Sequence, residues 1–184
     1  MITLRTSRLV LEPPTVDDVD AIAAYCADPE VQRWTTVPSP YTREDAVAFL
    51  EHVVAPGWRD GSEESWGIRL AATNELLGMI SARRALEDVG YWMGAPYRGQ
   101  GYLVEALTAV LDHRFAQGQE LVRWECVRGN VPSARTARRA GFTYTGEAPS
   151  RIRSRDGAYP DAWHGVLRRD DDRAPKPGWP EAVA

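Results

Sequence analysis

The chain has 184 residues, of which 43% are apolar and 26% charged, and its formal net charge is −4. This composition is ordinary for a folded soluble protein and excludes disordered and fibrous classes. The negative charge argues against electrostatic binding to nucleic acid, and the absence of a run of ~20 apolar residues or a signal-peptide core predicts a cytoplasmic protein without a membrane span.

The N-terminal segment predicts one strand followed by broken helices. Residues Arg8–Glu12 predict a strand, which ends at Pro13. Capping residues then begin three helices: Thr15 with Asp18, Asp28 with Pro29, and Thr42 with Asp45. The third helix is expected to bury Phe49, Leu50 and Val53.

Three strands are predicted next, at Ser65–Thr73, Leu76–Arg84 and Asp88–Met93. The turn dipeptide Asn74-Glu75 joins the first two. Because the three follow one another with short connections, we expect an antiparallel meander.

A glycine-rich loop follows the third strand and leads into a helix with apolar residues at helical spacing. Glycines at a helix start let backbone N–H groups approach an anion, and Arg98 adds a fixed positive charge. The dinucleotide pattern G-x-G-x-x-G is excluded because Val104 stands where a small residue is required, and no G-x-x-x-x-G-K-[ST] sequence occurs.

The C-terminal half predicts a strand, a helix and a hairpin. Residues Leu121–Val127 form the strand, which follows a helix and therefore needs a crossover. Asn130 caps the next helix and Gly141 ends it. Two strands are expected within Tyr144–Leu167, around Asp156-Gly157. Beyond them, a charged, Pro-rich tail at 169–184 carries Trp179 and is expected to dock on its own domain or on a neighbour. We predict that residues 170–184 pack at a dimer interface or along the rim of the acceptor cleft, because a single aromatic cannot offset the entropy of ordering the tail.

Two spaced motifs resemble those of the GNAT superfamily of acyl-CoA-dependent N-acyltransferases. Arg98-Gly99-Gln100-Gly101-Tyr102-Leu103 is similar to the family's [QR]-x-x-G-x-[GA] loop, and Glu105-Ala106 completes the G-Y-x-x-E-A run of the ribosomal-protein N-acetyltransferase-like branch. Asn130, Ser133 and Gly141-Phe142 resemble the second signature. The chain departs from the family at Leu103, where Gly or Ala is usual, and at Ala137, where many members have a Tyr.

The resemblance implies a single α/β (α+β) domain at residues 1–168. The expected architecture is a mixed, mostly antiparallel sheet of six to seven strands flanked by about four helices. A V-shaped splay is expected between the two central strands, Asp88–Met93 and Leu121–Val127.

The resemblance also implies acetyl-CoA as the cosubstrate and no metal. Its expected contacts are Tyr91, Trp92, Met93, Arg98, Gly99, Gln100, Gly101, Tyr102, Leu103, Asn130 and Ser133. Since the Tyr is absent at 137, Ser133 becomes the candidate that stabilises the thiolate. Asp88 or Glu87 is the candidate base, with Glu125 as a third possibility, although acids at a strand end are as readily explained as solvated side chains.

Trp34 and Tyr41 are candidate substrate contacts, with packing of the helical roof as the simpler explanation. The implied function is transfer of an acetyl group to a primary amine, either a protein N-terminus or a small molecule. A non-catalytic acyl-CoA-binding module, another acyl-CoA, and a polyamine or aminoglycoside acceptor remain alternatives. Expected partners exclude nucleic acid and membranes and include a possible homodimer.

Overall fold

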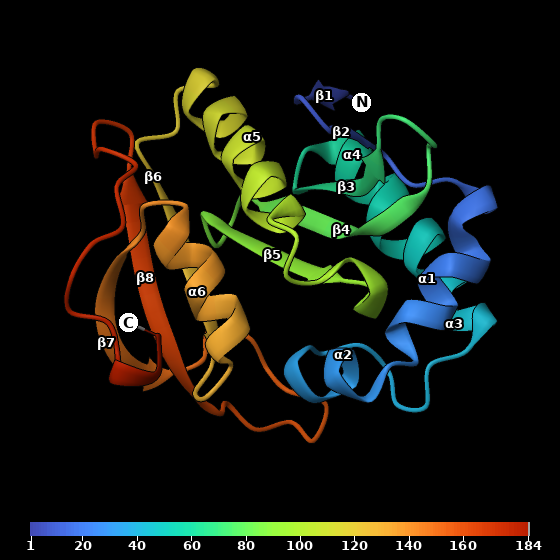
Figure 1. The fold of residues 1–184 in the computed structure, drawn as a ribbon. Helices are drawn as coiled ribbons and strands as arrows, with labels where there is room; N and C mark the ends of the chain where they lie inside the picture. The colour runs from blue at the N-terminus through green and yellow to red at the C-terminus, as the bar shows by residue number, and fades with distance from the viewer. Residues whose placement is uncertain (184) are drawn as a thin grey trace. The chain divides into compact units, whose positions relative to one another are not determined.

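The computed structural model describes residues 1–183, which form two compact units, one at Met1–Val110 and one from Leu111 onward (Figure 1). Helix α5 (Tyr102–Ala116) contains the junction between them. None of the helices within residues 1–183 has the length and apolar character that crossing a membrane requires.

The sheet of the first unit has five strands in chain order: β1 (Leu4–Arg5), β2 (Leu9–Glu12), β3 (Glu63–Leu70), β4 (Leu76–Arg83) and β5 (Asp88–Met93). Every neighbouring pair is antiparallel. The predicted meander is therefore confirmed. Asn74 has a φ of 63° in the β3–β4 turn, which is the left-handed conformation that Asn tolerates better than most residues.

The helices of the first unit are α1 (Val19–Cys26), α2 (Pro29–Trp34), α3 (Arg43–Phe49) and α4 (Ala55–Asp60). Both predicted capping boxes form, and Asp28 caps α2 by accepting from the backbone N–H of Glu30 at 2.8 Å. The apolar faces of α1, α2 and α3 pack with Leu76 and Met79 of β4.

A π-helical turn, η2 (Leu50–Val54), joins α3 to α4 and corrects one expectation. The wider turn shifts the helical register, so Val54 is buried and Val53 is 39% exposed. The sequence pattern assumed an uninterrupted α-helix and so predicted Val53 on the buried face.

The second unit holds three antiparallel strands in the order β6 (Leu121–Val127), β8 (Asp161–Arg168) and β7 (Thr143–Pro149). Helix α6 (Val131–Arg139) has its N-cap at Asn130 as predicted. The hairpin ladder ends where Pro149 meets Asp161, so Asp156-Gly157 lies inside a longer loop, 150–160, rather than in a tight turn.

The C-terminal tail packs on its own unit. Trp179 is buried, with its ring centroid 5.5 Å from that of Trp124 and 5.4 Å from that of Tyr144. Arg135 of α6 also donates a hydrogen bond to the carbonyl of Ala182 at 2.9 Å. The tail thus packs on its own unit, which is one of the surfaces expected for it, and a contact with a neighbouring subunit stays a prediction.

The strand count is higher than expected. The first unit contributes five strands and the second three, because the short β1 (Leu4–Arg5) was not recognised in the sequence. The expected splay between β5 and β6 involves both units and stays a prediction.

Candidate functional site

The glycine loop has the backbone geometry of an anion cradle. After the short 3-10 turn η3 (Ala95–Tyr97), Gly99 and Gly101 take φ values of 77° and 80°, which side-chain-bearing residues rarely adopt. No hydrogen bond joins the backbone N–H groups of residues 99–103 to an acceptor within residues 1–183. A Cβ built on Gly99 would have no atom within 4 Å, so a ligand can approach the backbone at this residue. These donors and the positive end of α5 fit a pyrophosphate.

Glu105, in the first turn of α5, fastens this loop to the β1–β2 turn. Its Oε1 accepts from the Thr6 hydroxyl at 2.5 Å and from the Arg8 backbone N–H at 3.0 Å, and its Oε2 accepts from Arg8 Nε at 2.7 Å. Burial acts to raise the pKa of Glu105, but the hydrogen bonds from Thr6 and Arg8 hold it below its ordinary value. Arg8 also donates to the Gln100 carbonyl at 3.1 Å. This clamp therefore shapes the cradle.

Arg8 is a site residue that the sequence did not indicate. Its guanidinium carbon lies 4.5 Å from the centre of the Tyr102 ring, in addition to its bonds with Gln100 and Glu105. The G-Y-x-x-E-A run singled out Glu105, but nothing in the sequence pointed to its partner Arg8, 97 residues away.

The guanidinium of Arg98 is bound by a backbone carbonyl and a carboxylate of the protein itself. Its Nε donates to the Met93 carbonyl at 3.0 Å, and its Nη2 pairs with Asp28 at 2.8 Å. Asp28 is also the N-cap of α2, so the salt bridge joins α2 to the glycine loop. The amide of Gln100 donates to the Pro96 carbonyl at 2.9 Å. Both side chains thus hold the loop in place, and their direct contact with a phosphate stays a prediction.

Strand β5 leads into the loop with Tyr91, Trp92 and Met93, as expected. Trp92 meets the ring of Tyr25 edge-on at 6.2 Å, and Met93 is buried. A Cβ on Gly94 would lie 3.0 Å from the same Tyr25 ring. The end of β5 is therefore fixed against α1, while the three residues' contact with acetyl-CoA stays a prediction.

The candidate bases Asp88 and Glu87 lie in different environments. Asp88 is buried, and its two oxygens accept from Arg83 Nε at 2.8 Å and from Nη2 at 3.0 Å. Glu87 is exposed in the preceding turn with a φ of 53°. The bidentate pair occupies the Asp88 carboxylate, so this geometry favours a structural role for Asp88.

Ser133 lies in the first turn of α6, as the second motif predicts. Its backbone N–H donates to Asn130 Oδ1 at 3.2 Å, and its Oγ accepts from the Trp124 indole at 3.3 Å. Burial raises the pKa of the neighbouring Cys126 thiol to about 12, although a side-chain hydrogen bond with Ser133 lowers it. Trp124, a positioning neighbour, was not singled out from the sequence.

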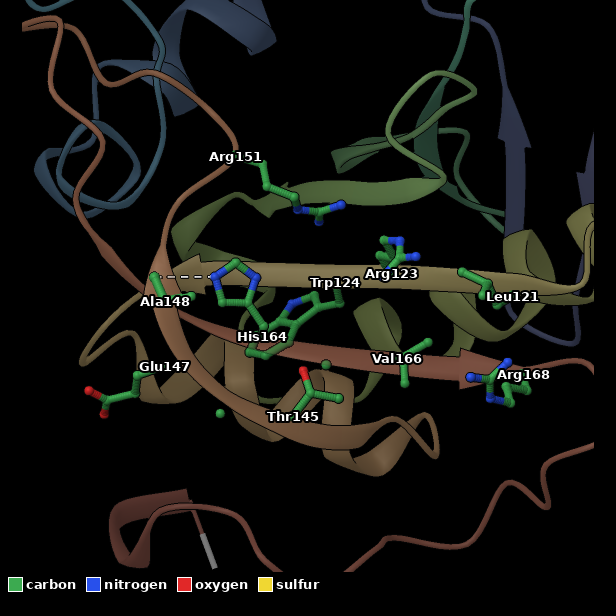
Figure 2. A pocket seen from close by; sticks show the side chains of 12 residues that line it. Leu121, Arg123, Trp124, Thr145, Glu147, Ala148, Arg151, His164, Val166 and Arg168 are labelled. Carbon is green, nitrogen blue, oxygen red and sulfur yellow. Dashed lines mark hydrogen bonds between the residues drawn. The ribbon is translucent and has the colours of Figure 1, made fainter.

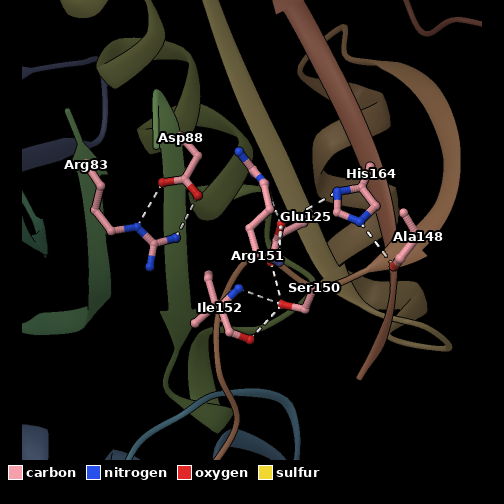
Figure 3. A network of polar contacts seen from close by, with 8 residues as sticks. All are labelled: Arg83, Asp88, Glu125, Ala148, Ser150, Arg151, Ile152 and His164. Atoms are coloured by element: carbon pink, nitrogen blue, oxygen red, sulfur yellow. Dashed lines mark hydrogen bonds and ion pairs between the residues drawn. The ribbon is translucent and has the colours of Figure 1, made fainter. Parts of the chain in front are cut away.

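Glu125 is the centre of a polar network in the second unit (Figure 3). It accepts from the Ser150 hydroxyl at 2.6 Å and from Arg151 Nε at 2.7 Å, and His164 Nδ1 lies 3.5 Å away. Burial acts to raise the pKa of Glu125, but the hydrogen bonds from Ser150 and Arg151 outweigh it and the pKa is lowered. The ionised carboxylate of Glu125 therefore holds the start of the 150–160 loop against β6.

Trp34 and Tyr41 pack within the helical roof of the first unit. The Trp34 indole donates to Glu30 at 2.9 Å, and Arg33 stacks on its ring at 4.5 Å. Tyr41 packs against the core formed by α1 and α3, and burial raises the pKa of its hydroxyl, which is hydrogen-bonded with Cys26. Both side chains have a structural explanation, and substrate contact stays a prediction for each.

No three His, Cys, Asp or Glu side chains within residues 1–183 gather in an arrangement that could hold a metal ion.

Comparison with known proteins identifies the family. A model described as the acetyltransferase (GNAT) domain matches residues 8–143. The ribosomal-protein-serine acetyltransferase of Escherichia coli (strain K12) is 36% identical over 80 residues, which are 40% of this chain and 44% of that protein.

Solved structures share the fold. A protein assigned as a ribosomal-protein-serine acetyltransferase from Vibrio cholerae superposes with a TM-score of 0.80 at 24% identity, over 91% of this chain and 97% of that one. The microcin C7 self-immunity acetyltransferase MccE, in complex with acetyl-CoA and AMP, gives a TM-score of 0.76 at 19% identity, over 89% of this chain and 93% of that one. The resemblance read from the two motifs is confirmed: the chain belongs to the GNAT acetyltransferase family, whose members use acetyl-CoA to acetylate amines.

Proposed function

We propose that this acetyltransferase acts on the α-amino group at the N-terminus of a polypeptide. Acetyl-CoA supplies the activated thioester, and residues 98–103 with the first turn of α5 would hold its pyrophosphate. The similarity to a ribosomal-protein-serine acetyltransferase over 80 residues agrees with a polypeptide acceptor.

The observation that carries the proposal is the state of the buried carboxylates. Asp88 is bound by Arg83 and Glu125 by Arg151, so neither carboxylate is arranged to take a proton from a strongly basic amine. Deprotonating a lysine-type amine with a pKa of ~10.4 costs about 4 to 5 kcal/mol at pH 7, whereas an α-amine with a pKa of ~8 costs about 1 kcal/mol. With both of these carboxylates paired to arginines, the α-amine is the better-suited acceptor, because it needs less help to lose its proton.

Ser133 takes the role of hydrogen-bond donor to the leaving sulfur in this proposal. Its Oγ accepts from the Trp124 indole at 3.3 Å, which orients the hydroxyl. A hydroxyl that stabilises developing negative charge contributes in the transition state more than in the bound substrate.

The test is a competition between two amines in one peptide. A peptide with a free N-terminal serine and one internal lysine is incubated with enzyme and acetyl-CoA, and the modified position is located by tandem mass spectrometry. We expect acetylation at the α-amine, with a rate that rises as pH approaches ~8. Acetylation confined to the lysine, or to polyamines and aminoglycosides supplied beside the peptide, would contradict the proposal.

A homodimer, the absence of nucleic-acid binding and a cytoplasmic location stay predictions from the sequence.

A further inference from the structure

The indole of Trp124 connects the hydroxyl of Ser133 to the docked tail. Its Nε1 donates to Ser133 Oγ at 3.3 Å, and its ring centroid lies 5.5 Å from that of Trp179. Figure 2 shows the Trp124 indole against β8, among the residues that line an open pocket of about 400 Å³ in the second unit. A single side chain therefore links Trp179 to the candidate catalytic hydroxyl.

The Trp124 ring is enclosed by the sheet and by the tail, and only 1% of the residue is exposed. A Cβ on Gly165 of β8 would lie 3.3 Å from Trp124 Cε3, so the ring rests on the β8 backbone. Trp179 packs against the same ring, with the two planes inclined at 53°. Because protein interiors are close-packed, a buried ring can turn only where a neighbour is removed. Trp179 is the neighbour that the tail supplies.

The hydrogen bond between Trp124 and Ser133 is long, and it is therefore sensitive to the position of the indole. Most N–H···O hydrogen bonds in proteins have donor–acceptor distances of ~2.7–3.2 Å, whereas this one is 3.3 Å. A further displacement of about 0.3 Å would take the two atoms beyond hydrogen-bonding distance. We therefore expect the bond to persist only while the ring is held in place.

The tail also contacts the helix that carries Ser133. Arg135, two residues further along α6, donates to the Ala182 carbonyl at 2.9 Å. Val183, in the 3-10 turn η4 (Glu181–Val183), is buried. The tail thus contacts both partners of the hydrogen bond: the indole through Trp179, and the helix of the hydroxyl through η4.

Trp179 contributes through its ring and not through a hydrogen bond of its own. Its Nε1 is buried and has no hydrogen-bond partner in the part of the chain that the structure describes, residues 1–183. A buried donor without a partner costs stability, so the favourable contribution of this side chain comes from its ring contacts. A phenylalanine at this position would keep an aromatic ring against Trp124.

We propose that Trp179 is a positioning residue for acetyl transfer, which acts by holding the Trp124 indole in hydrogen-bonding contact with Ser133. The inference rests on the proposed function, in which Ser133 stabilises the leaving sulfur. Trp179 and Trp124 then contribute to kcat through Ser133, and neither of them needs to contact a substrate. A merely structural role for Trp179 would lower stability without any dependence on Ser133.

The experiment is a double-mutant cycle measured in kcat. Trp179→Ala, Trp179→Phe and Trp124→Phe are made in the wild type and in the Ser133→Ala background. Release of the CoA thiol is followed with acetyl-CoA and a peptide that has a free N-terminal serine. Trp58→Ala is the matched control, because it removes a ring contact of the same kind, between Trp58 and Trp66, from the first unit. Urea unfolding establishes conditions under which every variant is folded.

We expect Trp179→Ala and Trp124→Phe each to lower kcat about fivefold, with the KM for acetyl-CoA changed less than about twofold, because each loses one neutral hydrogen bond to Ser133. In the Ser133→Ala background the same substitutions should change kcat less than about twofold, since the group that they position is gone. Trp179→Phe keeps the ring contact and Trp58→Ala leaves the second unit unchanged, so both should keep kcat within about twofold of the wild type.

Crystal structures of the wild type, Trp179→Phe and Trp179→Ala measure the hydrogen bond directly. The distance from Trp124 Nε1 to Ser133 Oγ should stay within ~3.5 Å in the first two and exceed it in Trp179→Ala. This readout separates the positioning role from a general loss of stability, which would not move the indole away from the hydroxyl.

Four results would overturn the positioning role. They are a wild-type kcat in Trp179→Ala, an equal loss of kcat on adding Trp179→Ala to Ser133→Ala, an unchanged distance from indole to hydroxyl in the Trp179→Ala crystal, and an equal loss of kcat in Trp58→Ala. The last result would mean that the loss of any such ring contact suffices.

Failure of the proposed function has a different signature. If a lysine peptide is acetylated and the N-terminal serine peptide is not, the α-amine acceptor is wrong, and the same cycle measured with the lysine peptide still decides the role of Trp179. If Ser133→Ala alone keeps the wild-type kcat, the catalytic role of Ser133 and its positioning by Trp179 are both refuted.

Discussion

Replacing Glu105 with glutamine should loosen the glycine loop at its attachment to the β1–β2 turn. The substitution keeps the shape of the side chain and one carbonyl oxygen, but it removes the negative charge that Arg8 and Thr6 contact. A charged hydrogen bond contributes ~1.5–3 kcal/mol when it is buried. Glu105 is 18% exposed and Arg8 45% exposed, so solvent screening reduces this to about 1–2 kcal/mol of unfolding free energy.

The same substitution should weaken CoA binding by about threefold, because Arg8 orders the Gln100 carbonyl in the cradle and a less ordered loop binds with a larger entropic cost. The effect on stability should also depend on pH. Since the pKa of Glu105 is lowered in the folded protein, its stabilisation is present above the ordinary glutamate pKa of ~4.3 and disappears as pH falls through the folded value. The wild type and the variant should therefore converge in stability in acid.

Urea unfolding at neutral and acidic pH, with calorimetric titration of CoA, measures both effects. Glu51→Gln is a matched control, because Glu51 is an exposed carboxylate outside the clamp. A Glu105→Gln variant that loses less than about 0.5 kcal/mol at pH 7 and binds CoA as the wild type does would refute the account of the clamp.

Three further substitutions test other parts of the structure. Gly101→Val should weaken CoA binding by more than about tenfold in calorimetry, because a β-branched residue is strained at a φ of 80° and its Cβ would sit 3.5 Å from Arg8; retained affinity would remove the cradle assignment. Ser133→Ala should lower kcat about tenfold and leave the KM for acetyl-CoA nearly unchanged, and the reverse pattern would make Ser133 a cosubstrate contact alone. Trp179→Ala should cost about 3 kcal/mol in urea unfolding, because a buried ring between Trp124 and Tyr144 is lost; an unchanged midpoint would show that the docked tail contributes nothing to stability.

Local patterns predicted most of the fold. β5 and β6 were located to the residue, and the capping boxes at Thr15 and Thr42 form as their spacing requires. Helix α5 begins at Tyr102, directly after the glycine-rich loop that was expected to lead into a helix. These successes concern interactions within a few residues, where side-chain chemistry fixes the backbone directly.

Interactions between distant segments account for what the sequence could not predict. The motif placed Arg98 beside a phosphate, but its salt bridge to Asp28 joins residues 70 positions apart. Arg151 lies 26 positions from Glu125, and its pairing decides whether that carboxylate can serve as a base. Arg83 is only five positions from Asp88 and faces it across the β4–β5 ladder, but the sequence did not show that the two side chains pair. The π-helical turn at Leu50–Val54 has no distinct sequence pattern, so the burial of Val54 emerged from packing.

The docked tail also has an optical consequence. The indoles of Trp124 and Trp179 lie 5.5 Å apart with their planes inclined at 53°. We expect transition dipoles at this distance and inclination to couple as an exciton pair, so that a bisignate far-ultraviolet circular dichroism band is present only when both rings are in place. Because Trp124 also donates to Ser133, one spectral signal reports the position of the chain terminus and the surroundings of the candidate catalytic hydroxyl, in solution and without a label.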